Sequence, residues 1–141
     1  MIPGPIPVSR VSDCAGLSAQ QVADFEAAGV IVLEDFVPVS ACRRLRERAI
    51  QLVDEFDPNS VRSVFSAMEQ TQLGDAYFEQ SGDKIRFFFE QDAFDDAGNL
   101  RQSKADSLNK IGHAMHDLYP VFDEFSRTPQ LGAVVESLGY D

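Results

Sequence analysis

The segment SGDKIRFFFEQDAF, residues 81–94, constrains the fold of this chain more than any other. Within it, Ile85, Phe87 and Phe89 occupy every second position. A period of two is typical of a β-strand, in which alternate side chains form one row. Three phenylalanines in succession are too apolar for an ordinary surface loop, so this row should pack against a core. The question is which other elements build that core.

Two helices and a strand are predicted ahead of this segment. Ser18 begins the Ser-x-x-Gln spacing of a capping box, and Gly29 stands where a C-terminal cap belongs, so a helix should run between them. The β-branched segment 30–36 predicts a short strand directly after that helix. A second helix should open at Ser40 and end before Pro58, because proline cannot continue a helix.

Helices dominate the predictions for the rest of the chain. DAYFEQSG is typical of a short helix, and the Asp, Gly and Asn content of 95–99 predicts a turn. From Ser103 onward we expect helices over 105–118, 120–126 and 129–138. This inventory has too few strands for a self-contained sheet, because two or three strands bury little surface alone. Another part of the fold should complete the sheet.

Composition is that of an ordinary globular protein of one domain. The chain has 141 residues, 44% of them hydrophobic and 25% charged, and a formal net charge of -11. Nucleic acid is not an expected partner, because the acidic excess repels phosphate and the basic residues are scattered. Cys14 and Cys42 give no disulfide framework and no metal-binding spacing. With no signal peptide and no membrane span in the sequence, we expect an intracellular, cytoplasmic protein.

Three segments together resemble the N-terminal part of the phytanoyl-CoA dioxygenase family: LSAQQVADFEAAGVIVLEDF, YFEQSGDKIRFFFEQDAFDDAGNL and SLNKIGHAMHDLYPVF. The resemblance implies an α+β fold, the N-terminal helices and flanking strands of a double-stranded β-helix, or jelly roll, with the barrel core largely missing. Residues 1–16 form an extended leader in this interpretation. Residues 17–141 form the N-terminal part of the domain, truncated before the iron-binding strands. Phe87, Phe88 and Phe89 would then pack with one row on helices and the other on barrel strands.

The family resemblance implies Fe(II) and 2-oxoglutarate as cofactors of the intact protein, and a small-molecule substrate. The family's H-x-D and distal histidine ligands have no counterpart here, since neither His113 nor His116 is followed two residues later by a carboxylate. On a helix, two histidines three apart could share one ion, but with Asp117 facing elsewhere we expect an ordinary packed or hydrogen-bonded pair. The sequence therefore predicts no catalytic or metal-binding residue in this chain, and no activity of the chain alone.

Lys110 is the one cofactor-binding residue that the resemblance carries over. In the family, the lysine of NKIGHA contributes to binding a 2-oxoglutarate carboxylate, for which an ammonium is chemically suited. The ordinary interpretation of such a residue is an exposed helix lysine. One lysine cannot hold the co-substrate by itself.

Loss of the barrel would leave apolar side chains uncovered. We expect Phe87, Phe89, Leu131 and Val134 to be exposed, which would favour self-association. An alternative function follows, in which the chain is a genuine short form that acts as a non-enzymatic interaction module. The sequence does not identify the substrate, because a family name does not establish what an enzyme acts on.

Overall fold

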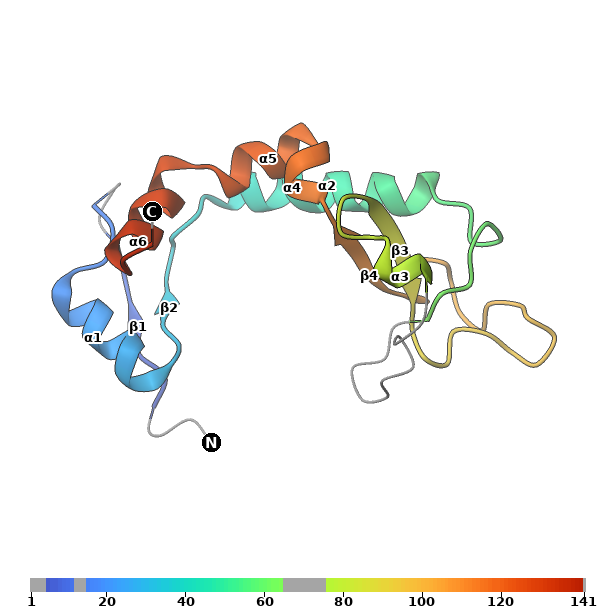
Figure 1. Cartoon of the computed structure of the whole chain (residues 1–141), viewed down its shortest axis with the longest axis horizontal. Helices are drawn as coiled ribbons and strands as arrows, with labels where there is room; N and C mark the ends of the chain where they lie inside the picture. Colours follow the sequence, from blue (N-terminus) through green and yellow to red (C-terminus); the bar gives the residue numbers. More distant parts are fainter. Residues whose placement is uncertain (1–4, 12–14, 65–75, 141) are drawn as a thin grey trace. The chain divides into compact units, whose positions relative to one another are not determined.

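The computed structural model describes residues 5–11, 15–64 and 76–140, which form two compact units (Figure 1). Unit 1 comprises Met1–Arg44 and Glu124–Asp141, and unit 2 comprises Leu45–Asp123. Cys14, parts of the 1–16 leader and the first residue of the DAYFEQSG helix lie outside the described residues.

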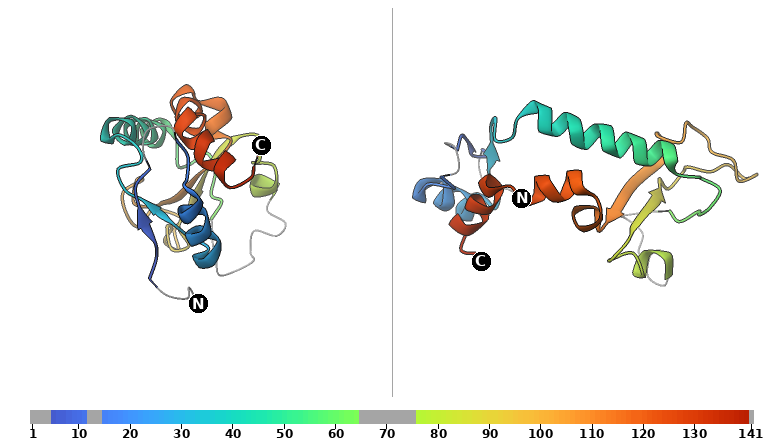
Figure 2. Two further views of the ribbon diagram at one scale, coloured as in Figure 1. Left: turned by 90° about the vertical axis from the view of Figure 1, so that its left-hand side faces the viewer. Right: turned by 90° about the horizontal axis from the view of Figure 1, so that it is seen from above.

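Unit 1 contains a two-stranded parallel sheet packed on a helix. Strand β1 (Val8–Ser9) pairs with β2 (Val32–Leu33), and helix α1 (Ala19–Ala28) lies beside them in both views of Figure 2. The predicted strand over 30–36 is confirmed in its central two residues. The strand within the leader was not predicted, because the sequence around Val8–Ser9 shows no alternation of apolar and polar residues. This segment becomes a strand only by pairing with β2.

The capping signals of α1 are confirmed. The backbone N–H of Gln21 donates to Ser18 Oγ at 3.3 Å, and the Ser18 N–H donates to Gln21 Oε1 at 2.8 Å, which is the reciprocal pair of a capping box. Gly29 ends the helix in the left-handed conformation at φ 72°. These local interactions satisfy backbone groups at both ends of the helix, so its limits follow the sequence closely.

Helix α6 (Pro129–Ser137) holds the segment that leads into α1. Ser137 Oγ accepts a hydrogen bond from the Leu17 N–H at 2.9 Å and donates to the Ala133 carbonyl at 2.6 Å. Gly16 lies directly on this helix at φ 67°, where a Cβ atom would fall 2.5 Å from the Ala133 oxygen. Only glycine fits both the conformation and the space at this position.

Long helix α2 (Val39–Glu55) matches the helix expected from Ser40 to before Pro58. The boundary between the two units falls within α2 and within α5 (Pro120–Ser126). In unit 2, Leu52 of α2 is buried, and Lys104 Nζ donates to two carbonyl oxygens at the end of the helix at 2.9 Å each. The predicted helices 120–126 and 129–138 are confirmed as α5 and α6.

Unit 2 is built on an antiparallel pair of strands, which corrects one prediction. Strand β3 (Ile85–Phe89) is confirmed, but its partner is β4 (Leu108–His113), in the middle of the segment predicted as a helix over 105–118. Only α4 (Met115–Leu118) is helical there. Leu108, Ile111 and Met115 have helical spacing, but backbone hydrogen bonds to β3 outweigh that local pattern.

The three phenylalanines of β3 point to two different faces. Phe87 and Phe89 both meet Phe56, with ring centroids 4.1 and 5.9 Å apart, and Phe87 is stacked on it. Phe88 faces the other way, edge-on to the rings of Tyr77 and Phe78, which lie 5.5 and 5.7 Å from it. These two belong to helix α3 (Ala76–Glu79), the short helix predicted in DAYFEQSG. The alternation predicted for this strand is therefore confirmed.

The expected exposure of these apolar faces is wrong. Phe89 is fully buried, because Phe56 and Phe94 pack against its ring, the latter at 4.7 Å. Phe87 is half-buried under the Phe56 stack, and Leu131 and Val134 are half-buried in unit 1. The chain therefore covers much of this surface with its own side chains. Described residues form two separate two-stranded sheets and no closed barrel.

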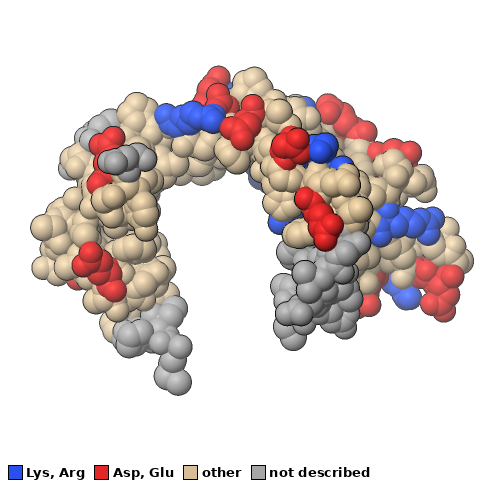
Figure 3. All heavy atoms as spheres, viewed as in Figure 1, with Lys and Arg blue, Asp and Glu red and all other residues tan. Residues whose placement is uncertain are grey.

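Charged side chains of both signs are interspersed on the face drawn in Figure 3. The ion pairs Arg44–Glu124 and Lys84–Asp83, each at 2.8 Å, are exposed. Exposed pairs of this kind contribute little to stability. Among the helices that the structure describes, none is both long enough and apolar enough to cross a membrane.

Candidate functional site

Lys110 lies on a strand and not on the exposed helix face of the ordinary interpretation. It is the register partner of Phe88 in the β3–β4 pair, and it is half-buried. Cross-strand partners share one face of a sheet, so Lys110 lies on the same face as the buried Phe88 ring. The α3 helix, which lies next to this pair in Figure 1, covers that face.

His113, at the end of β4, makes a direct contact with Lys110. Its Nε2 atom lies 2.7 Å from Lys110 Nζ, and its Nδ1 atom lies 2.8 Å from Ser81 Oγ. Ser81 is 1% exposed, and its hydroxyl donates to the carbonyl oxygen of Phe78 at 2.5 Å. We call these four residues, with Phe88, the Lys110 cluster. Lys110, His113 and Phe88 were singled out in the sequence, whereas Ser81 and Phe78 were not.

The hydrogen bonds of the cluster run in one direction. Ser81 has a single hydroxyl hydrogen, which goes to the Phe78 carbonyl, so its oxygen must accept from His113 Nδ1. A ring that donates from Nδ1 and is neutral has a lone pair on Nε2, and the Lys110 ammonium can only donate. The chain of donors therefore runs from Lys110 through His113 and Ser81 to the backbone.

The two phenylalanine rings of the cluster lie beside its lysine and its histidine. Lys110 Nζ lies 5.8 Å from the centroid of the Phe78 ring, within the range of a cation–π contact. The His113 imidazole is edge-on to Phe78 at 5.6 Å and tilted against Phe88 at 6.0 Å. A cation beside apolar rings is less screened from an anionic ligand than a cation on an open surface.

The residues considered for metal binding do not come together. His113 belongs to the Lys110 cluster, whereas His116 lies on α4, is exposed, and has its Nε2 atom 3.3 Å from Asp117 Oδ2. His113 is hydrogen-bonded and packed, as expected of an ordinary histidine. The expectation that Asp117 faces elsewhere is wrong, because it faces His116, and the two histidines share no helix, since His113 ends β4. Within the described ranges, no three side chains of His, Cys, Asp or Glu are grouped to hold a metal ion. These residues do not fit the iron that the family implies.

Two exposed carboxyls have altered acidity but lie outside the cluster. The side chain of Lys84 donates to Asp83 and lowers the pKa of that carboxyl. The backbone N–H of Asn99 donates to the Asp95 carboxylate at 2.7 Å and holds the pKa of Asp95 below its usual range. Both groups are solvated, so their effect on ligand binding elsewhere is screened.

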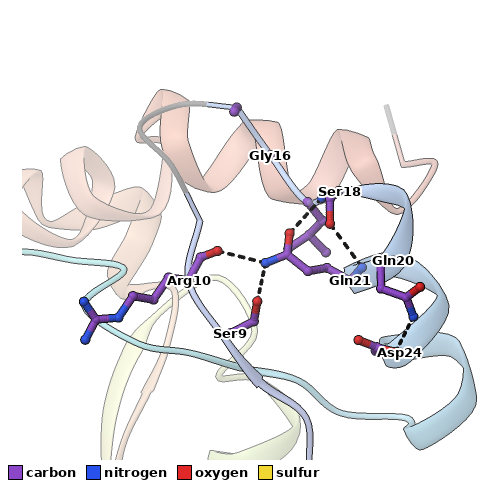
Figure 4. A pocket seen from close by; sticks show the side chains of 9 residues that line it. Ser9, Arg10, Gly16, Ser18, Gln20, Gln21 and Asp24 are labelled. Carbon is purple, nitrogen blue, oxygen red and sulfur yellow. Dashed lines mark hydrogen bonds between the residues drawn. The ribbon is translucent and has the colours of Figure 1, made fainter.

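A shallow hollow of about 540 Å³ lies in unit 1, between β1 and the start of α1 (Figure 4). Gln21 is buried in its wall, with its amide donating to Ser9 Oγ at 2.6 Å and to the Arg10 carbonyl at 2.9 Å. Its amide oxygen accepts from Ser18 N–H. Because every polar atom of this side chain has a protein partner, Gln21 ties β1 to α1 and offers no group to a ligand.

Comparison with known proteins decides the family. The model for phytanoyl-CoA dioxygenase (PhyH) matches residues 25–140, which is most of the chain and includes the whole Lys110 cluster. This chain belongs to the phytanoyl-CoA dioxygenase family. The resemblance drawn from the three sequence segments is thereby confirmed.

Relatives from distant organisms support the same family. The chain is 41% identical over 124 residues to an Arabidopsis thaliana protein named phytanoyl-CoA dioxygenase. It is 42% identical over 130 residues to the Rattus norvegicus phytanoyl-CoA dioxygenase domain-containing protein 1, and 39% identical over 123 residues to a Dictyostelium discoideum homologue of that protein. These matches cover 88%, 89% and 87% of this chain but only 44%, 45% and 43% of the relatives. The chain thus spans less than half the length of the relatives it matches.

Sequence reasoning missed two members of the Lys110 cluster, Phe78 and Ser81. Ser81 and Phe78 precede Lys110 by about thirty residues and carry no ligand-binding motif, so no local pattern could have found them. Only the β3–β4 register and the position of α3 bring Phe78 to the lysine and Ser81 to His113.

Proposed function

We propose that this chain is the N-terminal part of a dioxygenase that uses Fe(II) and 2-oxoglutarate to hydroxylate an unactivated C–H bond of a small molecule. Membership of the phytanoyl-CoA dioxygenase family supports the dioxygenase class. Iron in such a protein activates O₂ at the expense of 2-oxoglutarate. Because the described residues form no group of three ligands, the ligands for iron lie elsewhere in our proposal. The jelly-roll barrel is part of the same proposal.

Lys110 contributes one contact to a 2-oxoglutarate carboxylate in this proposal. The observation that carries it is the placement of Lys110 Nζ against His113 Nε2, 2.7 Å away, and near the Phe78 ring. A lysine whose ammonium group is already held in place by neighbouring side chains loses less side-chain entropy when it binds an anion. Its role is to bind and orient the carboxylate, and it takes no part in proton transfer.

Substitution of Lys110 tests this role. In the protein as its gene encodes it, Lys110→Met should raise the KM for 2-oxoglutarate about tenfold to a hundredfold, since a hydrogen bond to a charged group contributes about 1.5–3 kcal/mol. Lys104→Met is the matched control, because Lys104 Nζ bonds the Asp54 and Phe56 carbonyls and should leave KM unchanged. A raised KM in Lys104→Met with an unchanged KM in Lys110→Met would transfer the role to Lys104.

The 141-residue chain by itself should be inactive. The assay is formation of succinate from 2-oxoglutarate by the purified chain with added Fe(II), compared with Fe(II) alone. We expect no difference, because the described part of the chain supplies no iron ligand set. Succinate above the metal blank that disappears on adding a chelator would refute this.

A non-enzymatic interaction module is the second candidate. It is favoured by exposed apolar side chains on the small sheet of unit 1, where Val8 and Val32 are register partners and are 59% and 43% exposed. Ile6, two residues before Val8 in the chain, is 45% exposed. Analytical ultracentrifugation distinguishes the candidates. A discrete dimer that Val8→Lys dissociates would support the module, and a monomer at all concentrations would exclude self-association.

A further inference from the structure

We propose that His113 is a positioning residue for Lys110, locked as its Nδ1-protonated tautomer by Ser81. This inference rests on the proposed function in one respect, the ligand of Lys110. It goes beyond that function by assigning roles to two residues, His113 and Ser81, to which the proposed function gives none.

The first step is the orientation of the imidazole. Ser81 is almost completely buried, and its only hydroxyl hydrogen is committed to the Phe78 carbonyl. At 2.8 Å, the Ser81 oxygen can therefore only accept from His113 Nδ1. The imidazole also packs against the rings of Phe78 and Phe88, which contact each other at 5.7 Å, and this packing restricts its rotation.

The second step is the consequence for Nε2. With the proton on Nδ1, the Nε2 lone pair lies 2.7 Å from the Lys110 ammonium and accepts from it. The opposite tautomer would place an N–H against an ammonium, which is a contact between two donors. Ser81 therefore selects the His113 tautomer that holds Lys110, although Ser81 acts on the lysine only through His113.

The third step is the effect of the His113–Lys110 hydrogen bond on ligand binding. A lysine side chain has four rotatable bonds and carries about 2 kcal/mol of rotamer entropy. The ammonium end of Lys110 is restrained by the hydrogen bond to His113 and lies near the Phe78 ring. Because a restrained ammonium has less freedom to lose, removing the His113 acceptor should weaken binding of a carboxylate without altering the chemical step.

The first test is spectroscopic and needs no turnover. In the protein as its gene encodes it, long-range ¹H–¹⁵N spectra report the tautomer of each imidazole, and the His113 signals are assigned by their loss in His113→Phe. We expect the Nδ1-protonated form in the wild type and a larger share of the Nε2-protonated form in Ser81→Ala, in which Lys110 alone still favours the Nδ1-protonated ring. Ser107→Ala is the matched control, because Ser107 is also buried and its hydroxyl also donates to a carbonyl, at 2.9 Å, but it contacts no histidine. An Nε2-protonated or doubly protonated His113 in the wild type at neutral pH overturns the proposal.

The second test separates positioning from packing. His113→Phe keeps an aromatic ring against Phe78 and Phe88 but removes the acceptor, and should raise the KM for 2-oxoglutarate about three- to tenfold with kcat unchanged. His113→Gln restores an acceptor near Nε2 and should recover most of that loss. His116→Phe, an exposed histidine three residues on, should leave KM unchanged. Equal KM values in His113→Phe and wild type, or equal losses in the Phe and Gln variants, overturn the positioning role.

The two tests distinguish failure of this inference from failure of the proposed function. If Lys110→Met leaves KM unchanged, the assignment of the co-substrate contact fails whatever the tautomer. If Lys110→Met raises KM but the wild-type ring is protonated on Nε2, the proposed function stands and His113 is no positioning residue.

Discussion

Substitution of Phe88 and of Phe87 should have unequal effects on stability, although the two residues are adjacent and identical. Phe88 is 0% exposed and is edge-on to the rings of Tyr77 and Phe78. Truncating a fully buried phenylalanine costs about 3–5 kcal/mol, and loss of two edge contacts places Phe88→Ala in the upper part of that range. Phe87 is half-buried with one stacked partner, Phe56, so Phe87→Ala should cost about half as much, roughly 1.5–2.5 kcal/mol.

Urea unfolding followed by circular dichroism measures the difference. The midpoint should fall further in Phe88→Ala than in Phe87→Ala at an unchanged m-value. Phe88→Leu provides a milder variant, with a loss of about 1–1.5 kcal/mol, if Phe88→Ala does not fold. Tyr140→Ala, at a side chain that is 66% exposed, is the control and should stay within about 0.5 kcal/mol of wild type.

The reasoning would be refuted by a cost under about 1 kcal/mol for Phe88→Ala, or by a larger loss in Phe87→Ala than in Phe88→Ala. The first result would mean that the Phe88 side of β3 is not a packed core. The second would mean that Phe87 faces the more tightly packed layer, and that the assignment of the two faces of the strand is reversed.

Three further predictions concern single positions. Gly16→Ala should destabilise unit 1 by several kcal/mol, because a Cβ at φ 67° meets the Ala133 oxygen; thermal unfolding measures it, and an unchanged midpoint would contradict the close approach. Ser18→Ala removes half of the capping box and should cost about 1 kcal/mol in urea unfolding, whereas Ser18→Asp should restore most of it; equal losses in both variants would exclude capping. The Asp95 carboxyl should titrate below its usual pKa in ¹³C NMR, since the Asn99 N–H stabilises the carboxylate. The stabilisation that comes from this hydrogen bond is present at pH values above the pKa of Asp95 in the unfolded chain, and it is lost as the pH falls through the lowered pKa of the folded chain. A titration of Asp95 at or above the usual aspartate pKa would contradict this.

The helix of unit 1 shows how much the sequence could predict. The Ser18 capping box, the left-handed Gly29 and the following strand all depend on groups within a few residues of each other. Local hydrogen bonds and backbone conformations of this kind follow directly from the residue types at these positions. The alternation of β3 is similar, because a period of two is a property of consecutive residues.

The candidate site could be predicted only in part. The family resemblance singled out Lys110, but His113 was considered as a possible metal ligand and Ser81 was not considered at all. Their contacts join residues 32 apart in the chain for Ser81 and His113, and depend on which strand pairs with β3. Segment 105–118 has helical spacing and was predicted as a helix, so the face on which Lys110 lies could not be derived.

The sequence by itself determined the family, the limits of α1 and α2, and the strand that carries three phenylalanines. Tertiary structure alone decided that residues 108–113 form β4 and that Val8–Ser9 becomes a strand. It also decided that His113 holds Lys110. The physical reason is the range of the interactions. Caps and periodicity act between neighbours in the chain, whereas strand pairing and side-chain hydrogen bonds between distant residues form only when the chain folds and can override a local helical preference.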